Sequence, residues 1–337
     1  MKTIFAALSI LTWAAAVCAQ APARARLATQ APRGSSVHQA LLGMGDKWRK
    51  APGGGVSLTF FTDGTMGGEA EMVRRMRVGQ IDGAVLTVVG LSEIDGAVKA
   101  LQEMPMMFRS LDEVDYIRGK LAPDLERRFL EKGFVVLFWG DVGWVRFFSK
   151  EPALHPSDLK RMKIFVWGGD TNQLDLMKSA GYRPVPLEIN DVLTGLQTGM
   201  IDVVPTAPFH ALAGQIYGPA PHMLEVNWVP LVGAAVITRK TWDSFPPAVR
   251  AELRRAAVEA GEYIKLTGRA ESDQSVEAMK KRRLTVHQTT PEIEAEWRKM
   301  AEEVYPKIRG HMVPAETFDE VRRLLTEYRA AGGKARP

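Results

Sequence analysis

A short segment occurs twice in the chain and constrains the fold more than any other feature of the sequence. The first copy, MRVGQIDGAVLT, covers residues 76–87, and the second, LQTGMIDVVPT, covers residues 196–206. Each copy ends a helical pattern at a glycine, Gly79 or Gly199, and continues through Ile-Asp into an apolar run. A glycine directly after a helix supplies the left-handed residue that ends it, and a short apolar run is typical of a buried parallel strand.

The surroundings of the two copies also match, since a strand, a loop and a helix precede each of them. The pattern therefore predicts two similar α/β lobes. Ligands of open α/β sheets bind beyond the carboxyl ends of the strands, so two facing lobes predict a cleft between them. The alternative is an ordinary α/β protein that contains two helix–glycine–strand joints without internal similarity.

The composition is that of a globular protein with room for two cores. The chain has 337 residues, of which 46% are hydrophobic and 25% charged, and a net charge of +5. Lysine and arginine are interspersed with acidic residues, and no basic block stands out. This distribution argues against nucleic-acid binding.

The N-terminus has the pattern of a secretory signal. Lys2 precedes an apolar run over residues 4–17, which is short for a membrane span, and small residues follow. We expect a signal peptide over residues 1–19, with cleavage near Ala19 or Ala21. Cleavage removes Cys18, the only cysteine, so the mature, exported protein would have no disulfide, thiol nucleophile or cysteine-bound metal.

After Val232 the pattern changes from strands to helices. Residues 232–238 predict a strand that returns to the first lobe, and residues after Pro247 predict a helix to about Arg283. At 1.5 Å per residue such a helix reaches roughly 55 Å, so it either spans both lobes or bends near Gly261 or Gly268. The predicted first lobe comprises residues 24–143 and 232–268, and the second lobe comprises residues 144–231 and 269–331.

Four segments together resemble the solute receptors of TRAP transporters of the DctP type. They are SSVHQALLGMGDKWRK, GTMGGEAEMVRRMRVGQIDGAVL, DLKRMKIFVW and GLQTGMIDVV, in that order. The resemblance covers nearly the whole mature chain. It implies a two-lobed periplasmic-binding-protein fold, type II-like, with a long helix linking the lobes. It also implies a receptor that closes on a small organic molecule, usually a carboxylate, and delivers it to a membrane permease.

The chain departs from the family pattern at the positions that would hold a carboxylate. Phe165 stands where the resemblance implies a ligand arginine, and Trp167 stands where a proline is common. Val145 occupies the place of a second arginine, and Arg146 is one residue away, which in a strand turns its side chain to the opposite face. Burying a carboxylate without a cation or donors costs several kcal/mol. A small diacid is therefore a poor candidate.

Aromatic side chains near strand ends and lobe junctions indicate an apolar or aromatic ligand. The threonines that end the two repeats occupy equivalent strand ends. The candidates from these two groups are Trp144, Phe165, Trp167, Phe209, Trp228, Thr87 and Thr206. The competing interpretation places most of these aromatic residues in the protein core.

Three polar residues are candidates, and two of them, Arg146 and Glu69, have two interpretations each. Arg146 either anchors an acidic head group or is structural. Glu69 either accepts a hydrogen bond from the ligand or stabilises the N-terminus of its helix, where a negative charge is favourable. His38 is a candidate polar contact, while the neighbouring Ser35 and Ser36 can cap a helix.

Enzyme and metal motifs are missing from the sequence. No pair among the six histidines has H-x-x-x-H spacing, and there is no G-x-S-x-G elbow, phosphate loop or dinucleotide fingerprint. We therefore predict no catalytic residue, no metal and no cofactor.

The sequence thus predicts a periplasmic solute receptor that delivers an apolar or amphipathic molecule to a TRAP-type permease. One alternative is a carboxylate receptor that uses Arg146. Another is a periplasmic shuttle for hydrophobic molecules or lipids, or a sensor input, that has no TRAP permease.

Overall fold

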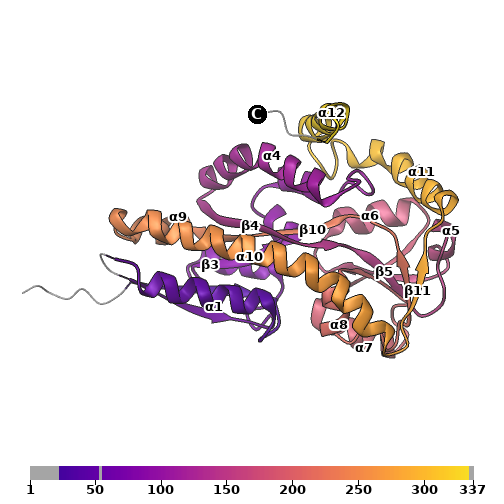
Figure 1. Ribbon diagram of the computed structural model, residues 1–337, viewed down its shortest axis with the longest axis horizontal. Coiled ribbons are helices and arrows are strands. Elements are labelled where there is room, and N and C mark those ends of the chain that lie inside the picture. Colours follow the sequence, from indigo (N-terminus) through magenta and orange to yellow (C-terminus); the bar gives the residue numbers. More distant parts are fainter. Residues whose placement is uncertain (1–22, 53–54, 334–337) are drawn as a thin grey trace, which may run out of the picture.

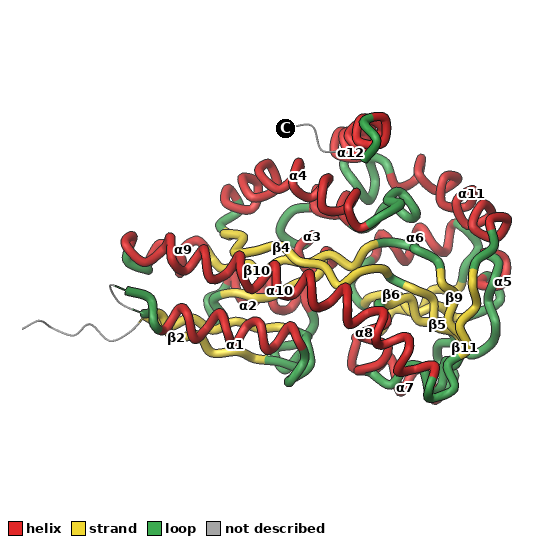
Figure 2. Tube along the Cα trace, viewed as in Figure 1, coloured by secondary structure: helices red, strands yellow, loops and turns green. Residues whose placement is uncertain are grey.

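The computed structural model describes residues 23–52 and 55–333, and its strands form two separate mixed sheets, one in each lobe (Figures 1 and 2). The predicted signal peptide lies outside the described residues. Within the described part, no helix is both long and apolar enough to cross a bilayer. The two-lobed α/β prediction is confirmed.

The first sheet belongs to lobe I and has five strands. In spatial order they are β2 (Val56–Phe61), β1 (Ala23–Thr29), β3 (Gly83–Thr87), β10 (Pro230–Thr238) and β4 (Phe134–Trp144). The first three are parallel, and β10 is antiparallel to both β3 and β4. Since β10 follows most of lobe II in the chain, the predicted return to the first lobe is confirmed.

The second sheet belongs to lobe II and has six strands. In spatial order they are β11 (Thr285–Gln288), β9 (His222–Glu225), β5 (Arg146–Ser149), β8 (Val203–Thr206), β6 (Lys163–Trp167) and β7 (Arg183–Leu187). Strand β6 is parallel to both β7 and β8, and β5 is antiparallel to β8 and β9.

Helices surround the two sheets. Those between the strands of the first sheet are α1 (Ser36–Arg49), α2 (Glu69–Arg77), α3 (Val88–Ser92), η1 (Gly96–Leu101) and α4 (Leu111–Glu131). Those between the strands of the second are α5 (Pro156–Leu159), α6 (Thr171–Ser179), η2 (Ile189–Asp191), α7 (Val192–Gln197) and α8 (Pro208–Ala213). The C-terminal part contains α9 (Arg239–Ser244), α10 (Pro247–Lys280), α11 (Pro291–Ile308) and α12 (Ala315–Ala330).

The repeated Ile-Asp forms the same reciprocal contact in both lobes. The Asp82 carboxylate accepts a hydrogen bond from the Arg26 backbone N–H at 2.8 Å, and the Asp82 N–H donates to the Arg26 carbonyl at 2.8 Å. In lobe II the Asp202 carboxylate accepts from the Lys163 N–H at 2.9 Å, and its own N–H donates to the Lys163 carbonyl at 2.7 Å. The aspartate thus ties the start of its strand to the neighbouring parallel strand, β1 in lobe I and β6 in lobe II.

The repeated glycine has the backbone that only glycine adopts without strain. Gly79 has a φ of +73° and Gly199 a φ of +75°. The Gly79 carbonyl accepts a hydrogen bond from the Arg26 guanidinium, and the Gly199 carbonyl accepts one from the Lys163 ammonium. The two lobes therefore share this local structure, as the repeated segment predicts.

Several segments connect the lobes. The β4–β5 segment leaves lobe I and β10 returns to it, while α10 runs without a break from lobe I across to α8 and α7 of lobe II (Figure 1). With 34 residues, α10 is roughly 51 Å long. Of the two expectations for this helix, the structure has the one that spans both lobes.

The glycines of α10 serve close packing. A Cβ atom on Gly261 would lie 2.8 Å from the Phe138 Cβ and 2.8 Å from the Trp139 carbonyl oxygen. A Cβ atom on Gly268 would lie 2.8 Å from Val142 Cγ1. Because α10 lies directly on β4, the missing side chains let the helix approach the strand.

Gly261→Ala is expected to destabilise the protein. Overpacking costs about 1–3 kcal/mol, which outweighs the gain in helix propensity of up to ~1 kcal/mol. The midpoint of urea unfolding should fall. The control is Gly119→Ala in α4, where a Cβ would meet no heavy atom within 4 Å, and which should raise the midpoint. Equal midpoints for the two variants would contradict the packing role of Gly261.

The C-terminal helix differs from the expected division of the chain. Residues 269–331 are predicted in lobe II, but the apolar face of α12 packs on lobe I. Phe318, Val321 and Leu325 of α12 belong to the same core cluster as Val114 and Ile117 of α4. The chain thus crosses back to lobe I after α11, where the apolar face of α12 is buried against α4.

Candidate functional site

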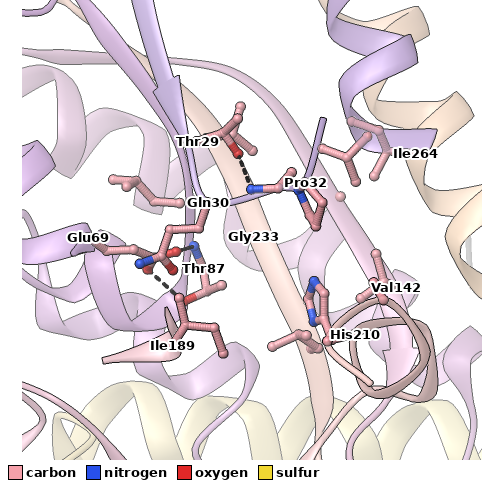
Figure 3. Close-up of a pocket in the computed structure, with 18 of the residues that line it drawn as sticks. Thr29, Gln30, Pro32, Glu69, Thr87, Val142, Ile189, His210, Gly233 and Ile264 are labelled. Carbon is pink, nitrogen blue, oxygen red and sulfur yellow. Dashed lines mark hydrogen bonds between the residues drawn. The ribbon is translucent and has the colours of Figure 1, made fainter. Parts of the chain in front are cut away.

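A cavity of about 420 Å³, the outer cavity, lies between the two sheets (Figure 3). Thr29, Thr87 and Trp167, the last residues of β1, β3 and β6, all line it. Strand carboxyl ends from both lobes therefore converge on one space, which is where open α/β sheets bind ligands.

The lobes touch at the rim of this cavity. The glycine loop before α2 faces the segment that leads into η2, since a Cβ atom on Gly68 would lie 2.6 Å from a carboxylate oxygen of Glu188. A Cβ atom on Gly64 would lie 3.5 Å from the Asn190 amide nitrogen. Ile189, between these two polar residues, lines the cavity. These loops are the parts that must separate for a ligand to enter.

The Glu69 carboxylate is fully engaged by the protein. One oxygen accepts from the Thr87 N–H at 2.9 Å, and the other accepts from the Thr87 hydroxyl at 2.7 Å and the Gly90 N–H at 2.9 Å (Figure 3). Burial raises the pKa of Glu69, although these hydrogen bonds oppose the shift. Glu69 and Thr87 therefore form a fixed wall of the cavity, with Glu69 holding α2 against β3 and α3.

Two further polar groups of the outer cavity, His210 and Asp141, carry no free charge. Desolvation lowers the pKa of His210 to about 4, so its imidazole is neutral at physiological pH. The Asp141 carboxylate accepts hydrogen bonds from the guanidinium groups of Arg118, at 2.9 Å, and Arg269, at 2.8 Å. Most of the remaining lining is apolar, and includes Val85, Phe138, Val142, Ile216 and Ile264.

A second cavity of about 150 Å³, the inner cavity, lies behind Trp167. Trp167 and Leu231 line both cavities, so the two are neighbours. The walls of the inner cavity are rich in aromatic rings, namely Phe147, Phe165, Trp167, Trp228 and Trp297. The rings of Phe165 and Trp167 pack at 5.7 Å between centroids.

Neither cavity is lined by a lysine or arginine of residues 23–52 and 55–333. The charged lining residues are all acidic, namely Asp63, Glu69 and Asp141 in the outer cavity and Glu103 and Asp170 in the inner one. The described residues also contain no group of three or more histidine and acidic side chains placed to hold a metal ion. The electrostatic character of the site is thus neutral to negative.

The residues proposed from the sequence divide into three groups. The outer cavity is lined by Glu69, Thr87 and Trp167. The inner cavity is lined by Phe165, Trp167, Thr206 and Trp228. Four residues line neither cavity: His38, Trp144, Arg146 and Phe209.

Arg146 lies on the face of β5 opposite to the inner cavity. Its neighbours Val145 and Phe147 line that cavity and Arg146 does not, as expected from the alternation along a strand. Burial lowers the pKa of Arg146, while the carboxylates of Glu225 and Asp273 oppose the shift. These two acidic residues belong to β9 and α10, so the charge of Arg146 is partly balanced by carboxylates outside the two cavities.

The other three residues of this group have local packing partners. The His38 imidazole accepts a hydrogen bond from the Gly34 N–H at 3.0 Å and closes the loop before α1. Trp144 belongs to the core of lobe I. The Phe209 ring packs against the His210 ring at 5.3 Å between centroids.

Sequence reasoning missed Glu103 and Tyr182 of the inner cavity and the lining role of His210. One signal for Glu103 exists, because Lys99 and Glu103 are four residues apart in the otherwise apolar segment GAVKALQEMPMMF. Charged residues in such a segment become buried and need a partner. No comparable signal marks Tyr182, whose position depends on the packing of α6 against β7.

The comparison with protein families shows which family the chain belongs to. Residues 27–310 match the model of bacterial extracellular solute-binding protein, family 7 (DctP). The chain belongs to the DctP family. Proteins of this family are transport components and not enzymes, which confirms the prediction of a receptor without catalytic function.

Relatives with assigned ligands are distant. The 2,3-diketo-L-gulonate-binding periplasmic protein YiaO of Escherichia coli is 27% identical over 252 residues, which are 73% of this chain and 75% of YiaO. The C4-dicarboxylate-binding periplasmic protein DctP of Rhodobacter capsulatus is 23% identical over 227 residues, which are 67% of this chain and 68% of that protein.

Solved structures of TRAP periplasmic solute-binding proteins have the same fold. The protein from Shewanella oneidensis with bound succinate has a TM-score of 0.83 at 18% identity, over 90% of this chain and 99% of that one. The protein from Xanthobacter autotrophicus with bound β-D-galacturonate has a TM-score of 0.81 at 21% identity, with the same shares of both chains. The DctP-family chain described here is therefore a TRAP-type receptor for small molecules.

Proposed function

We propose that this DctP-family receptor captures an apolar or amphipathic molecule without a carboxylate in the periplasm and delivers it to a TRAP-type permease. The observation that carries the proposal is the lining of the two cavities, which contains carboxylates but no lysine or arginine of the described residues. A buried ligand carboxylate would meet no cation there and would face like charges.

Desolvation disfavours the burial of a ligand carboxylate in these cavities. A carboxylate transferred into a protein costs several kcal/mol unless it is paired, and a charge-assisted hydrogen bond returns about 1.5–3 kcal/mol. Phe165 lines the inner cavity at the position where the family resemblance implies the pairing arginine. An aromatic ring at this position favours an apolar part of the ligand instead.

The two named relatives, YiaO and DctP, bind acids according to their names. The ligand class proposed for this chain differs from theirs and can be tested. Capture would proceed by closure of the lobes about β4, β10 and α10, with the rim loops at Gly68 and Glu188 meeting last. A carboxylate receptor that uses Arg146 is the second candidate. The structure favours it less, because Arg146 lines neither cavity.

The test is native mass spectrometry of the purified mature protein, followed by extraction and identification of the bound molecule. We expect a molecule with a sizeable apolar part and no carboxylate. Calorimetry should show no saturable binding of succinate or D-galacturonate at millimolar concentration. Recovery of a small diacid, or tight binding of succinate, would contradict the proposal. A permease gene beside the receptor gene would distinguish a transport receptor from a periplasmic shuttle or sensor input.

A further inference from the structure

The inner cavity contains a buried carboxylate, that of Glu103, whose contact with the Lys99 ammonium is a long one of 3.4 Å. Glu103 is 8% exposed and lines the cavity, and neither of its carboxylate oxygens has a hydrogen-bond partner in the described structure. Buried polar groups in folded proteins nearly always have a partner, and an unpartnered buried acceptor is costly. Such a carboxylate can accept a hydrogen bond from a donor group of a bound ligand.

The charges around Glu103 do not balance. The Lys99 ammonium lies 3.4 Å from a Glu103 oxygen and 3.6 Å from an Asp170 oxygen. One buried cation is therefore shared by two buried carboxylates, with side-chain exposures of 8%, 6% and 4% for Lys99, Glu103 and Asp170. The Asp170 carboxylate has another role, since it accepts the Gln173 N–H at the start of α6. An excess negative charge thus remains at Glu103.

A second buried polar group without a hydrogen-bond partner in the described structure lies in the same cavity. The Tyr182 hydroxyl is buried, lines the inner cavity and has no partner in the described structure. Between these polar groups the walls are aromatic and include Phe165, Trp167 and Trp228. Carboxylates and aromatic faces together are the surroundings that cationic amines prefer.

We propose that the inner cavity binds a protonated amine of the ligand, with Glu103 as the ion-pair partner and the aromatic walls around the adjoining apolar part. The proposal rests on the proposed function and assigns the chemical class of the ligand. The cavity volume of about 150 Å³ matches a cavity that accommodates benzene. A single ring or a compact branched chain therefore fits next to the amine.

The test uses three probes with one ring and different head groups: cyclohexylamine, cyclohexanol and cyclohexanecarboxylate. Calorimetry on the purified full-length mature protein should show the amine binding at least tenfold more tightly than the alcohol, and the carboxylate not at all. In Glu103→Gln, amine affinity should fall at least tenfold while alcohol affinity changes less than threefold. The matched control is Glu262→Gln, an exposed residue of α10, which should change neither.

The pH dependence separates a charge role from a packing role. Burial and the nearby Asp170 raise the pKa of Glu103 to about 7, although Lys99 opposes the shift. Cyclohexylamine stays protonated across neutral pH, so its affinity should rise as the pH increases from 6 to 8 and Glu103 loses its proton. In Glu103→Gln this rise should disappear. The charged groups beside Glu103 are Lys99 and Asp170, and Tyr182 is a further ionisable group that lines the same cavity.

The outcomes distinguish the two proposals. If the alcohol binds as tightly as the amine and Glu103→Gln has no effect, the amine inference is wrong. The proposed function, a receptor for ligands without a carboxylate, is not contradicted by that result. If only the carboxylate binds, the proposed function is wrong. If none of the three probes binds at millimolar concentration, the amine inference is also contradicted.

Discussion

Asp141→Asn should lower the free energy of unfolding by about 3 kcal/mol, since removing one partner of a buried ion pair leaves an uncompensated charge. The Asp141 side chain has no solvent exposure and accepts hydrogen bonds from Arg118 and Arg269 at 2.8–2.9 Å. In the variant, both guanidinium groups would share only Asp115, whose side chain is 32% exposed. The midpoint of urea unfolding measures the effect.

The network around Asp141 joins three elements at the start of the lobe connection. Arg118 and Asp115 belong to α4, Asp141 to β4 and Arg269 to α10. Burial alone would raise the pKa of Asp115, but the hydrogen bonds from Arg269 and the charges of both arginines hold it below its ordinary value. We therefore expect the variant to loosen α10 from β4 as well as to unfold more easily.

The control for this prediction is Asp124→Asn on the same helix. Asp124 pairs with Arg127 and Arg128 at the surface, with half of its side chain exposed. Exposed ion pairs contribute 0–1 kcal/mol, so this variant should remain close to the parent protein. Similar midpoints for Asp124→Asn and Asp141→Asn would show that the buried network does not stabilise the fold.

Trp167→Ala should weaken binding of the natural ligand at least about tenfold, which corresponds to about 1.4 kcal/mol. Among the site residues proposed from the sequence, Trp167 lines both cavities. Its loss would remove the aromatic wall between the cavities and the packing partner of Phe165. Buried tryptophan residues at binding sites often contribute more than 2 kcal/mol. Calorimetry with the molecule recovered from the purified protein measures the change.

Phe209→Ala is the matched control for Trp167→Ala. Phe209 is an aromatic residue of α8 that is half-buried but lines neither cavity. Its removal should leave ligand affinity within about twofold of the parent value. A large loss in Phe209→Ala with none in Trp167→Ala would contradict the assignment of the two cavities as the ligand site.

Much of the local structure could be predicted from the sequence because it depends on neighbouring residues. Ser110 and Asp170 cap their helices through backbone N–H groups three residues ahead, at 3.2 Å and 3.1 Å. The repeated glycines end their helices at positive φ, as the pattern of Gly79 and Gly199 predicts. The family resemblance then indicated the arrangement of these elements in two lobes.

The candidate site was less predictable, because it depends on contacts between distant segments. Phe165 and Trp167 line the inner cavity, but so do Ile164 and Val166 of the same strand, so strand alternation alone does not predict this lining. Arg146 could be expected on the opposite face from Val145 by the same rule. The polar lining of the inner cavity could not be predicted, because Glu103, Asp170 and Tyr182 come from three separate segments.

The sequence by itself determined the paired lobes, their repeated helix–glycine–strand units and the loss of a cation at position 165, since each depends on residue type or short-range spacing. Only the tertiary structure decided that α10 runs unbroken across both lobes, that α12 covers lobe I, and that the Glu103 carboxylate lines a buried cavity. Packing over long sequence separations decides these features, and burial, which sets the cost of an unpaired charge, exists only after the lobes have formed.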